Sequence, residues 1–488
     1  MPNYVNKTKI IATIGPATSS KEKLKELFDA GVNLCRLNFS HGTHADHLEV
    51  INRILELNEE LGTNIAMLAD LQGPKLRIGE VENNGIELVE GAEIEFINTP
   101  CLGNLERVYM SYPLFASDVA IGDTVLIDDG KLKLEVINTN GKDTVRAKVI
   151  FGGTLSSKKG VNLPKTKISL PSLTEKDLAD AEFALEHDVD WMALSFVRSA
   201  KDIKDLRKLI DKKGKHTNII AKIEKPEALG EIDEIINVSD AIMVARGDLG
   251  VELHFSEVPL KQKMIVDKCI QRAKPVIIAT QMMESMITNF SPTRAEANDV
   301  ANAVIDGTSA VMLSGETSVG KYPIEVIKAM SRIVSDAEQF GYKYHRLQEP
   351  IIGKERFILD ATCHTAANMA IQSQVKAIVV LTYSGESVRR IASYRPKANI
   401  YAFTPNKQIL RQLSLHWGVQ AYLCDDFLYT NDAVEYTLTY LHANEVIEEG
   451  EVVVSVGTLP MNKKGSTNMV KFSYYHEDVI NRPPNRGE

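Results

Sequence analysis

The chain has 488 residues, of which 44% are hydrophobic and 25% charged, and its formal net charge is −9. This length exceeds what one hydrophobic core usually fills, so we expect a globular protein of two or three domains. The acidic balance argues against nucleic acid or an anionic membrane as the main partner, so an anionic substrate needs a local cluster of Lys, Arg and metal.

The start of the chain and its cysteines indicate the compartment. Residues 1–7 show no basic stretch followed by an apolar stretch, and no apolar run approaches the roughly 20 residues of a membrane helix. The five cysteines are scattered and form no CxxC pair, which is typical of a reducing compartment and not of a disulfide framework or a structural zinc site. We therefore expect a cytoplasmic protein without a membrane segment.

Residues 1–71 and 167–345 repeat one unit, a short β-branched apolar run followed by a loop and an amphipathic helical segment. Eight apolar runs are predicted as strands: Ile10–Ile14, Val32–Asn38, Ile65–Asp70, Trp191–Phe196, Asn218–Ile223, Ala241–Ala245, Val276–Thr280 and Ala310–Leu313. Such runs alternating with helices indicate a parallel sheet covered by helices. Eight units favour a closed (β/α)₈ TIM barrel over the alternative, an open doubly wound sheet, and place chemistry at the C-terminal strand ends.

The third unit is interrupted by residues 72–166, where alternation replaces the helical period. Turn signals at Asp128-Asp129-Gly130 and within 138–141 indicate hairpins of a small, barrel-like all-β insertion. Helical patterning resumes at Ser172-Leu173-Thr174-Glu175. An insertion in a strand-to-helix loop lies over the active-site face, so we expect a mobile lid, with an inert decoration as the alternative.

Residues 346–488 are predicted as a separate α/β domain for regulation or assembly. The sequence predicts a helix over Asp360–Ser373 and a strand over Ala377–Leu381. Further strands are expected at Asn399–Phe403, Ala421–Leu423 and Val452–Val456. The whole chain is therefore predicted as an α/β protein with an inserted all-β lid.

Polar residues at the predicted strand ends suggest the chemistry. Lys222 and Glu224 face the same way because side chains alternate along a strand. Glu224 and Asp248, on adjacent strands, suit Mg²⁺, while Lys222 and Arg36 add fixed positive charge. Gly247 lets a backbone N–H approach an anion closely. Such a set suits phosphoryl transfer, and the alternative is a salt-bridge network that closes the barrel.

The chain lacks the motifs of several other enzyme classes. Neither GxGxxG nor GxxxxGK[ST] occurs, so dinucleotide and P-loop sites lose their main support. GxSxG and HExxH are also absent, which argues against that serine-nucleophile signature and that zinc motif.

Nine stretches between residues 13 and 323, in order, resemble pyruvate kinase. They are TIGPAT (13–18), RLNFSHGTH (36–44), DLQGPKLR (70–77), KKGVNLP (158–164), KIEKPEAL (222–229), IMVARGDLGVE (242–252), ATQMMESM (279–286), PTRAEANDVANAV (292–304) and MLSGETSVGKYP (312–323). The C-terminal domain is similar more loosely, through TYSGES and YRP. The resemblance implies a glycolytic phosphotransferase that moves the phosphoryl group of phosphoenolpyruvate to ADP, giving ATP and pyruvate, and a homotetramer.

The resemblance also implies roles for individual residues. Glu224 and Asp248 match the ligands of Mg²⁺ (or Mn²⁺), Lys222 the lysine that stabilises the phosphoryl in flight, and Arg36 the arginine that holds it. The backbone of Gly247 and Asp248 is expected to receive the substrate carboxylate.

The remaining implied roles concern the proton donor and the nucleotide. Thr280 is expected beside the enolate, and either Thr280 or water ordered by Ser314 is the expected proton donor. The residues expected on the nucleotide side are Arg77, Lys159, Asn38 and His41. The alternative for Arg77 and Lys159 is an ordinary solvated surface charge.

The chain departs from one family pattern at the monovalent cation site. Many members that bind K⁺ carry Glu and Thr where this chain has Lys75 and Leu71. Asn38, Ser40, Asp70 and Leu71 still line the matching position. An ammonium fixed nearby repels K⁺ and supplies its charge, so we expect activity without K⁺, with a plain surface role for Lys75 as the alternative.

The turn at 382–387 matches the family's sugar-phosphate effector loop. Thr382, Ser384, Gly385 and Ser387 join a strand to a helix, where backbone N–H groups attract phosphate. Residues 463–468 are expected to close over it. Glu386 repels phosphate, so an ordinary turn without a ligand is the alternative.

Two other functions compete with phosphoryl transfer. A metal-dependent aldolase or lyase on the same barrel explains Glu224, Asp248 and Lys222 but gives no role to Arg77 or Lys159. A non-catalytic sugar-phosphate-binding regulator is expected to have lost Lys222, Glu224 or Asp248, and none of them is missing.

Overall fold

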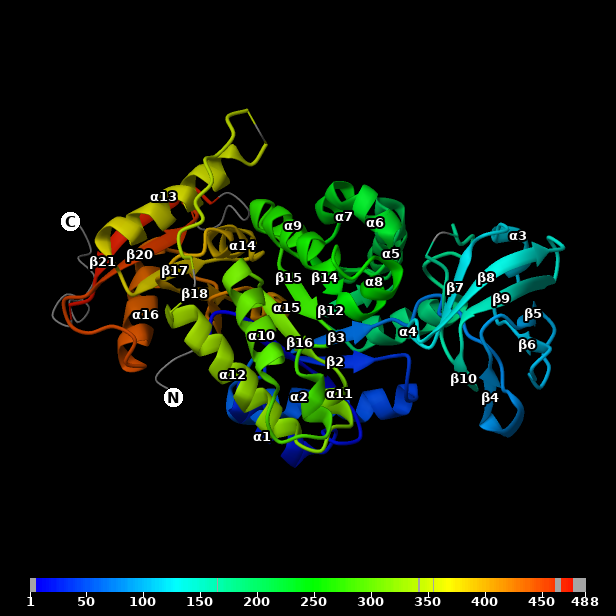
Figure 1. Cartoon of the computed structure of the whole chain (residues 1–488). Helices are drawn as coiled ribbons and strands as arrows, with labels where there is room; N and C mark the ends of the chain where they lie inside the picture. Colours follow the sequence, from blue (N-terminus) through cyan, green and yellow to red (C-terminus); the bar gives the residue numbers. More distant parts are fainter. Residues whose placement is uncertain (1–5, 165, 341–342, 354, 461–466, 477–488) are drawn as a thin grey trace, which may run out of the picture.

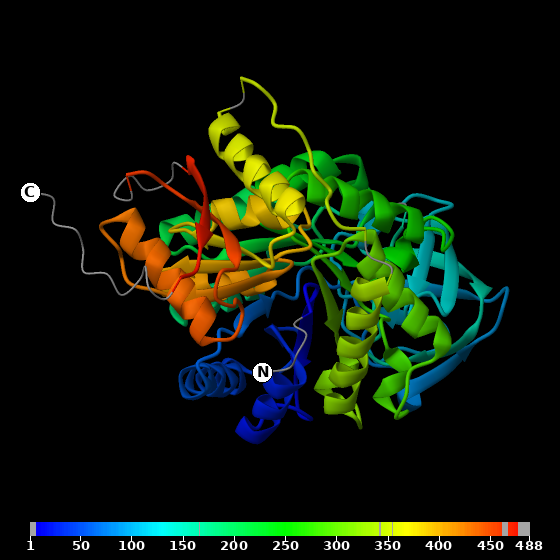
Figure 2. The same cartoon turned by 90° about the vertical axis from the view of Figure 1, so that its left-hand side faces the viewer.

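The structure, a computed structural model, describes residues 6–164, 166–340, 343–353, 355–460 and 467–476. A closed barrel occupies the middle of the molecule, the insertion extends from one end of it, and the C-terminal part covers the other end (Figure 1). Figure 2, turned by 90°, shows the C-terminal part in front of the barrel.

Eight parallel strands form the barrel in the order β1-β16-β15-β14-β13-β12-β3-β2. Their bounds are β1 Lys9–Ile14, β2 Leu34–Asn38, β3 Ala66–Asp70, β12 Trp191–Leu194, β13 Asn218–Ile223, β14 Ala241–Ala245, β15 Val276–Ala279 and β16 Ala310–Leu313. The predicted closed barrel is confirmed. The open doubly wound alternative is wrong, because β1 pairs with both β2 and β16.

Helices surround the barrel strands. They are α1 Lys21–Ala30, α2 His44–Leu61, α4 Glu175–Glu186, α5 Ala200–Lys212, α6 Pro226–Gly230, α7 Ile232–Val238, α8 Arg246–Glu252, α9 Val258–Gln271, η2 Glu284–Ile287, α10 Arg294–Asp306, α11 Gly315–Ser318 and α12 Pro323–Phe340. The start of α4 follows from its capping box, in which Thr174 and Asp177 bond each other's backbone N–H groups.

Alternation along the strands separates two apolar layers. In β1, Ile10, Ala12 and Ile14 pack outward against the helices, while Ile11 joins the side chains that fill the barrel. Leu415 of the C-terminal part completes this inner cluster. The barrel is therefore a packed core, and its chemistry is confined to the rim.

The insertion is mostly antiparallel, with hairpins at β7–β8 and β8–β9 where its turn signals predict them, while β5 and β6 pair in parallel. Its elements are η1 Glu82–Asn84, β4 Gly85–Leu88, β5 Glu93–Ile97, β6 Arg107–Tyr109, α3 Phe115–Asp118, β7 Thr124–Ile127, β8 Leu132–Thr139, β9 Thr144–Phe151, β10 Gly153–Ser156 and β11 Val161–Asn162. Between β7 and β8, Asp128, Asp129 and Gly130 all have positive φ, which Asp and Gly tolerate in tight turns. Figure 1 shows β2 and β3 running toward this insertion, so it lies at the C-terminal end of the barrel.

The C-terminal part is a five-stranded sheet in the order β19-β18-β17-β20-β21 with helices on it. Its elements are α13 Phe357–Ser373, β17 Ala377–Leu381, α14 Glu386–Ser393, β18 Asn399–Thr404, α15 Lys407–Gln412, η3 Leu413–Leu415, β19 Val419–Leu423, α16 Thr430–Ala443, β20 Val452–Gly457 and β21 Met469–Tyr474. The sequence predicts every strand here except β21, the antiparallel edge. Half of the side chains of β21 are exposed, so its apolar pattern is weak.

This part packs on the N-terminal face of the barrel. Arg411 Nε lies 2.8 Å from an Asp190 carboxylate oxygen just before β12, and Arg395 donates to the Gly307 carbonyl at 2.8 Å. The opposite, C-terminal face is left to the insertion.

The boundaries at 71/72, 166/167 and 345/346 stay predictions. Within the described ranges, no helix is both long and apolar enough to cross a bilayer.

Candidate active site

Lys222 near the end of β13 is the centre of a buried charge cluster. Its Nζ donates to Ser195 Oγ at 2.7 Å and lies 3.0 Å from Glu224 Oε1 and 3.2 Å from Asp70 Oδ1. Burial lowers the pKa of Lys222, but the carboxylates of Asp70 and Glu224 outweigh burial and raise the pKa above its ordinary value. The ammonium is therefore a fixed positive charge at the barrel mouth.

Arg36 on β2 is held rigidly beside this ammonium. Its Nε and Nη2 each lie 2.7 Å from Asp70 Oδ2, and its Nη1 donates to Thr13 Oγ1 at 2.9 Å. Burial raises the pKa of Asp70, but Lys222 and Arg36 outweigh burial and lower the pKa below its ordinary value. Asp70 therefore stays ionised and orients both cations.

Glu224 and Asp248 supply two carboxylates whose charges act on Lys222. The Glu224 side chain is 1% exposed, and its Oε2 accepts the Phe196 N–H at 2.6 Å. Burial and the charge of Asp248 raise the pKa of Glu224, although Lys222 opposes them. Glu224 is buried and Asp248 is half-buried, and two hard carboxylates that repel each other fit a divalent cation.

The number of protein ligands also fits Mg²⁺. Magnesium commonly binds one or two carboxylates and completes its shell with water and substrate oxygens. Glu224 and Asp248 are therefore the residues that would hold it.

Thr280 and Gly247 meet at the ends of β15 and β14. The Gly247 N–H donates to Thr280 Oγ1 at 2.7 Å. Thr280 has a φ of +68°, a strained conformation for a β-branched residue, and Arg246 fixes it by donating to its carbonyl at 2.9 Å. The hydroxyl of Thr280 is thus aimed at the N-terminus of α8, where Asp248 lies.

Ser314 follows β16 and is fixed by its backbone. Its N–H donates to Glu316 Oε2 at 2.7 Å, and Glu316 Oε1 accepts the Met283 N–H at 3.2 Å. The sequence did not single out Glu316, a 3% exposed carboxylate that joins the loops after β15 and β16.

Two oxygens of the predicted monovalent cation site already accept hydrogen bonds from protein groups. Asn38 Oδ1 accepts the Ser40 N–H at 3.1 Å, and the Leu71 carbonyl accepts Ser195 Oγ at 2.7 Å. Lys75 is exposed and lines a cavity of about 30 Å³ between insertion and barrel, together with Asp248. The charges that act most on Asp70 are Lys222 and Arg36.

The predicted nucleotide residues divide between the insertion and the β2 loop. Arg77 Nη1 donates to the Lys158 carbonyl at 3.0 Å, and Lys159 Nζ lies 2.9 Å from Asp128 Oδ1, so both pair within the insertion. His41 is exposed, and its N–H donates to the Asn38 carbonyl at 3.1 Å.

The predicted effector loop lines a cavity of about 550 Å³ in the C-terminal part. Thr382 Oγ1 accepts the Gly385 N–H at 2.9 Å, Gly385 has a φ of +79° and precedes α14, and Ser387 is buried. Ser384 also lines the cavity. Residues 463–466, expected to close over the loop, lie outside the described residues; Thr467 and Asn468 line the same cavity.

Ser195 and Thr13 are contacts of the cluster that the sequence analysis missed. Ser195 directly follows β12, so the strand-end rule that found Lys222 and Asp248 applies to it as well. Thr13 lies inside the apolar strand β1 and offers no such signal.

Comparisons with known proteins agree with this geometry. The family described as "Pyruvate kinase, barrel domain" matches residues 5–327, and "Pyruvate kinase, alpha/beta domain" matches residues 360–472. A pyruvate kinase of Geobacillus stearothermophilus is 43% identical over 95% of this chain and 80% of its own length. One of Mycobacterium intracellulare is 41% identical over 97% and 99%.

A solved structure has the same fold. A pyruvate kinase from Cryptosporidium parvum superposes with a TM-score of 0.89 at 34% identity, covering 96% of each chain. The chain therefore belongs to the pyruvate kinase family, and the phosphotransferase predicted from its sequence is confirmed.

Proposed function

We propose that this chain transfers the phosphoryl group of phosphoenolpyruvate to ADP at the cluster of Lys222, Arg36, Glu224 and Asp248. The observation that carries the proposal is the position of the Lys222 ammonium, 3.0 Å from Glu224 and 3.2 Å from Asp70 at the barrel mouth. A transferring phosphoryl group spreads negative charge over its oxygens, and fixed cations in a buried site stabilise that charge.

Each side chain has a role that follows from its contacts. Lys222 stabilises the phosphoryl group in flight, because its raised pKa keeps it charged. Arg36, oriented by Asp70 and Thr13, holds the phosphoryl oxygens. Glu224 and Asp248 hold Mg²⁺ or Mn²⁺, which when bound neutralises substrate oxygens and aligns them.

The substrate carboxylate and the enolate belong on the side of Thr280. The backbone N–H groups of Gly247 and Asp248 bind the substrate carboxylate. In the structure the Gly247 N–H donates to the Thr280 hydroxyl, so the carboxylate replaces that hydroxyl as the acceptor. Thr280, or water ordered by Ser314, protonates the enolate. Arg77 and Lys159, with Asn38 and His41, serve the nucleotide, and movement of the insertion as a lid brings the first two over the barrel mouth.

A lactate-dehydrogenase-coupled assay with phosphoenolpyruvate, ADP and Mg²⁺ tests the activity. We expect pyruvate to form only when both substrates are present. Pyruvate released from other substrates without ADP would favour the competing metal-dependent aldolase or lyase, which uses the same carboxylates and lysine.

We expect the reaction to proceed without K⁺, because Lys75 and Leu71 stand where K⁺-binding members carry Glu and Thr. The Lys75→Glu variant should gain K⁺ activation, since a carboxylate attracts the ion that an ammonium repels. Initial rates in Tris buffer free of sodium and potassium, with and without added K⁺, measure both. A wild-type rate that K⁺ raises more than about tenfold, or about 1.4 kcal/mol in barrier, contradicts the prediction.

Three further expectations from the sequence stay predictions. They are a homotetramer, a cytoplasmic location and a sugar phosphate bound at the loop 382–387. Size-exclusion chromatography with light scattering measures the first directly.

A further inference from the structure

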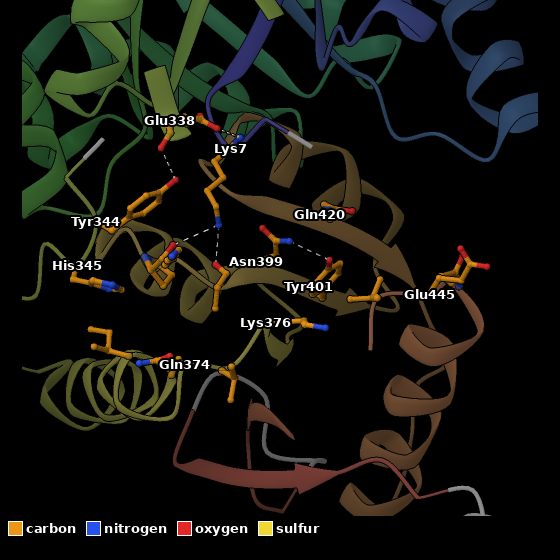
Figure 3. Close-up of a pocket in the computed structure, with 18 of the residues that line it drawn as sticks. Lys7, Glu338, Tyr344, His345, Gln374, Lys376, Asn399, Tyr401, Gln420 and Glu445 are labelled. Atoms are coloured by element: carbon orange, nitrogen blue, oxygen red, sulfur yellow. Dashed lines mark hydrogen bonds between the residues drawn. The ribbon is translucent and has the colours of Figure 1, made fainter. Parts of the chain in front are cut away.

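The insertion and the C-terminal part meet the barrel in different ways. A cavity of about 1210 Å³ remains between the barrel and the C-terminal sheet, where Lys7 Nζ donates to the Ala398 carbonyl at 2.9 Å (Figure 3). The cavity between the insertion and the barrel rim measures about 30 Å³, and Asn162 and Lys225 line it beside Asp248. The insertion is therefore seated closely against the rim that carries the proposed metal ligands.

Glu252, the last residue of α8, is a point of contact with the insertion. Its Oε1 accepts a hydrogen bond from Asn162 Nδ2 at 3.0 Å and lies 2.5 Å from Lys225 Nζ. The Glu252 side chain is 1% exposed and that of Lys225 7% exposed, so the ion pair is buried. Among the described residues, Glu252 Oε2 has no hydrogen-bond partner. The carboxylate therefore depends on Asn162 and Lys225, because a buried charge without compensation is costly.

The ion pair of Lys225 and Glu252 joins the two segments that carry the proposed metal ligands. Lys225 directly follows Glu224 after β13, and Glu252 belongs to the same helix as Asp248. The pair thus holds α8 against the segment after β13. A contact of the insertion with Glu252 is therefore a contact with the framework of the metal site.

Asn162 is fixed within the sheet of the insertion. It lies on β11, which pairs antiparallel with β7. The turn after β7 also lies against α8, since a Cβ added at Gly130 would be 3.8 Å from Val251 Cγ1. Asp128 of the same turn pairs with Lys159 at 2.9 Å. A shift of Asn162 away from α8 therefore displaces Lys159 as well.

The segments that connect the insertion to the barrel are held by contacts of their own. The Gly73 N–H donates to Asp177 Oδ1 at 3.0 Å on the first connection. Arg198, just after β12, donates to the carbonyls of Ile168 and Leu170 on the second connection. These contacts fix the connections and leave the angle of the insertion's sheet to its contacts with α8.

We propose that the hydrogen bond from Asn162 to Glu252, oriented by Lys225, is a latch that holds the insertion in the position that binds the nucleotide. This inference rests on the proposed function, which assigns Arg77 and Lys159 of the insertion to the nucleotide. The three latch residues act through the insertion and not on the reacting atoms, so they are positioning residues. When the latch is broken, the apparent affinity for the nucleotide falls in proportion to the molecules that keep the insertion in place.

Isothermal titration calorimetry of the full chain with ADP and Mg²⁺ tests the latch without turnover. Asn162→Ala removes the bond without changing any charge, and it should weaken ADP binding about tenfold, because a hydrogen bond to a charged group is lost. In the coupled assay the same variant should raise KM for ADP by that factor and leave KM for phosphoenolpyruvate within about twofold. A loss of stability alone does not produce this split. Asn431→Ala, an exposed change on α16, is the matched control and should bind ADP like the wild type.

The Glu252→Gln background shows whether Asn162 acts through Glu252. There the bond from Asn162 is no longer charge-assisted and has about half its strength, so Asn162→Ala should weaken ADP binding only about threefold. An equal tenfold loss in both backgrounds would overturn the latch and show that Asn162 contacts ADP directly.

Two further outcomes would contradict the latch and can be told apart. Wild-type ADP affinity in a folded Asn162→Ala variant overturns the latch alone and leaves the proposed function intact. A wild-type chain that does not bind ADP at all overturns the proposed function, and the latch with it. Thermal unfolding followed by circular dichroism verifies that each variant is folded at the temperature of the titration.

Discussion

The Lys222→Met variant is expected to slow phosphoryl transfer by about a hundredfold to a thousandfold while remaining folded. Methionine keeps most of the length of the side chain but removes the charge that stabilises the transferring group. Removing one such group from a buried site costs about 3–4 kcal/mol in barrier. Asp70 keeps its two contacts with Arg36, so one pair of the cluster survives. The coupled assay gives kcat, and thermal unfolding with circular dichroism verifies the fold.

This variant separates a catalytic cluster from a salt-bridge network that merely closes the barrel. If the network is only structural, Lys222→Met lowers the stability and leaves kcat nearly unchanged in the molecules that remain folded. Lys215→Met is the matched control, because Lys215 pairs with Asp188 at 2.8 Å on the surface. Surface pairs contribute about 0–1 kcal/mol, so that variant should keep both activity and stability.

The Glu224→Gln variant is expected to bind the divalent cation about a hundredfold more weakly or worse. The amide preserves the size of the side chain and an oxygen for the Phe196 N–H, but it loses the charge that attracts the metal. Substituting a residue that only hydrogen-bonds a metal ligand already lowers metal affinity by about 10–100-fold. Substituting the ligand itself should lower the affinity at least as much. Electron paramagnetic resonance with Mn²⁺ measures the affinity without turnover, and rates against Mg²⁺ concentration give the catalytic consequence.

Glu182→Gln serves as the control for this experiment. Glu182 pairs with Lys213 at 3.1 Å on the surface, so the same chemical change there should alter neither Mn²⁺ binding nor rate. Equal Mn²⁺ affinity in Glu224→Gln and the wild type would remove Glu224 from the metal site. The role of that carboxylate would then be its ion pair with Lys222.

The strand and helix pattern was predictable because it depends on local chemistry. Strand β13 was predicted with the bounds it has, Asn218–Ile223, and the start of α4 follows from the box of Thr174 and Asp177. The edge strand β21 was missed, since Met469–Tyr474 is half exposed and lies at the edge of the sheet, paired antiparallel with β20. Alternation requires a buried face, and an edge strand carries little of that signal.

The ion-pair partners of the site residues were less predictable than the positions of those residues at the strand ends. The strand-end rule singled out Lys222, Glu224 and Asp248 from a single sequence, because the carboxyl ends of parallel strands meet at one rim. It did not reveal that Asp70 joins Lys222 to Arg36, since these residues lie on three strands. Ser195 was missed although it obeys the same rule.

By itself, the sequence determined the closed barrel, the inserted hairpins, the C-terminal sheet and the residues at the barrel rim, because periodicity and turn chemistry act over a few neighbouring residues. Only the tertiary structure decided which charges neutralise one another. It pairs Asp70 with both Lys222 and Arg36, and it brings Glu338 beside Lys7. Electrostatic energy depends on distance and burial, which no spacing along the chain specifies.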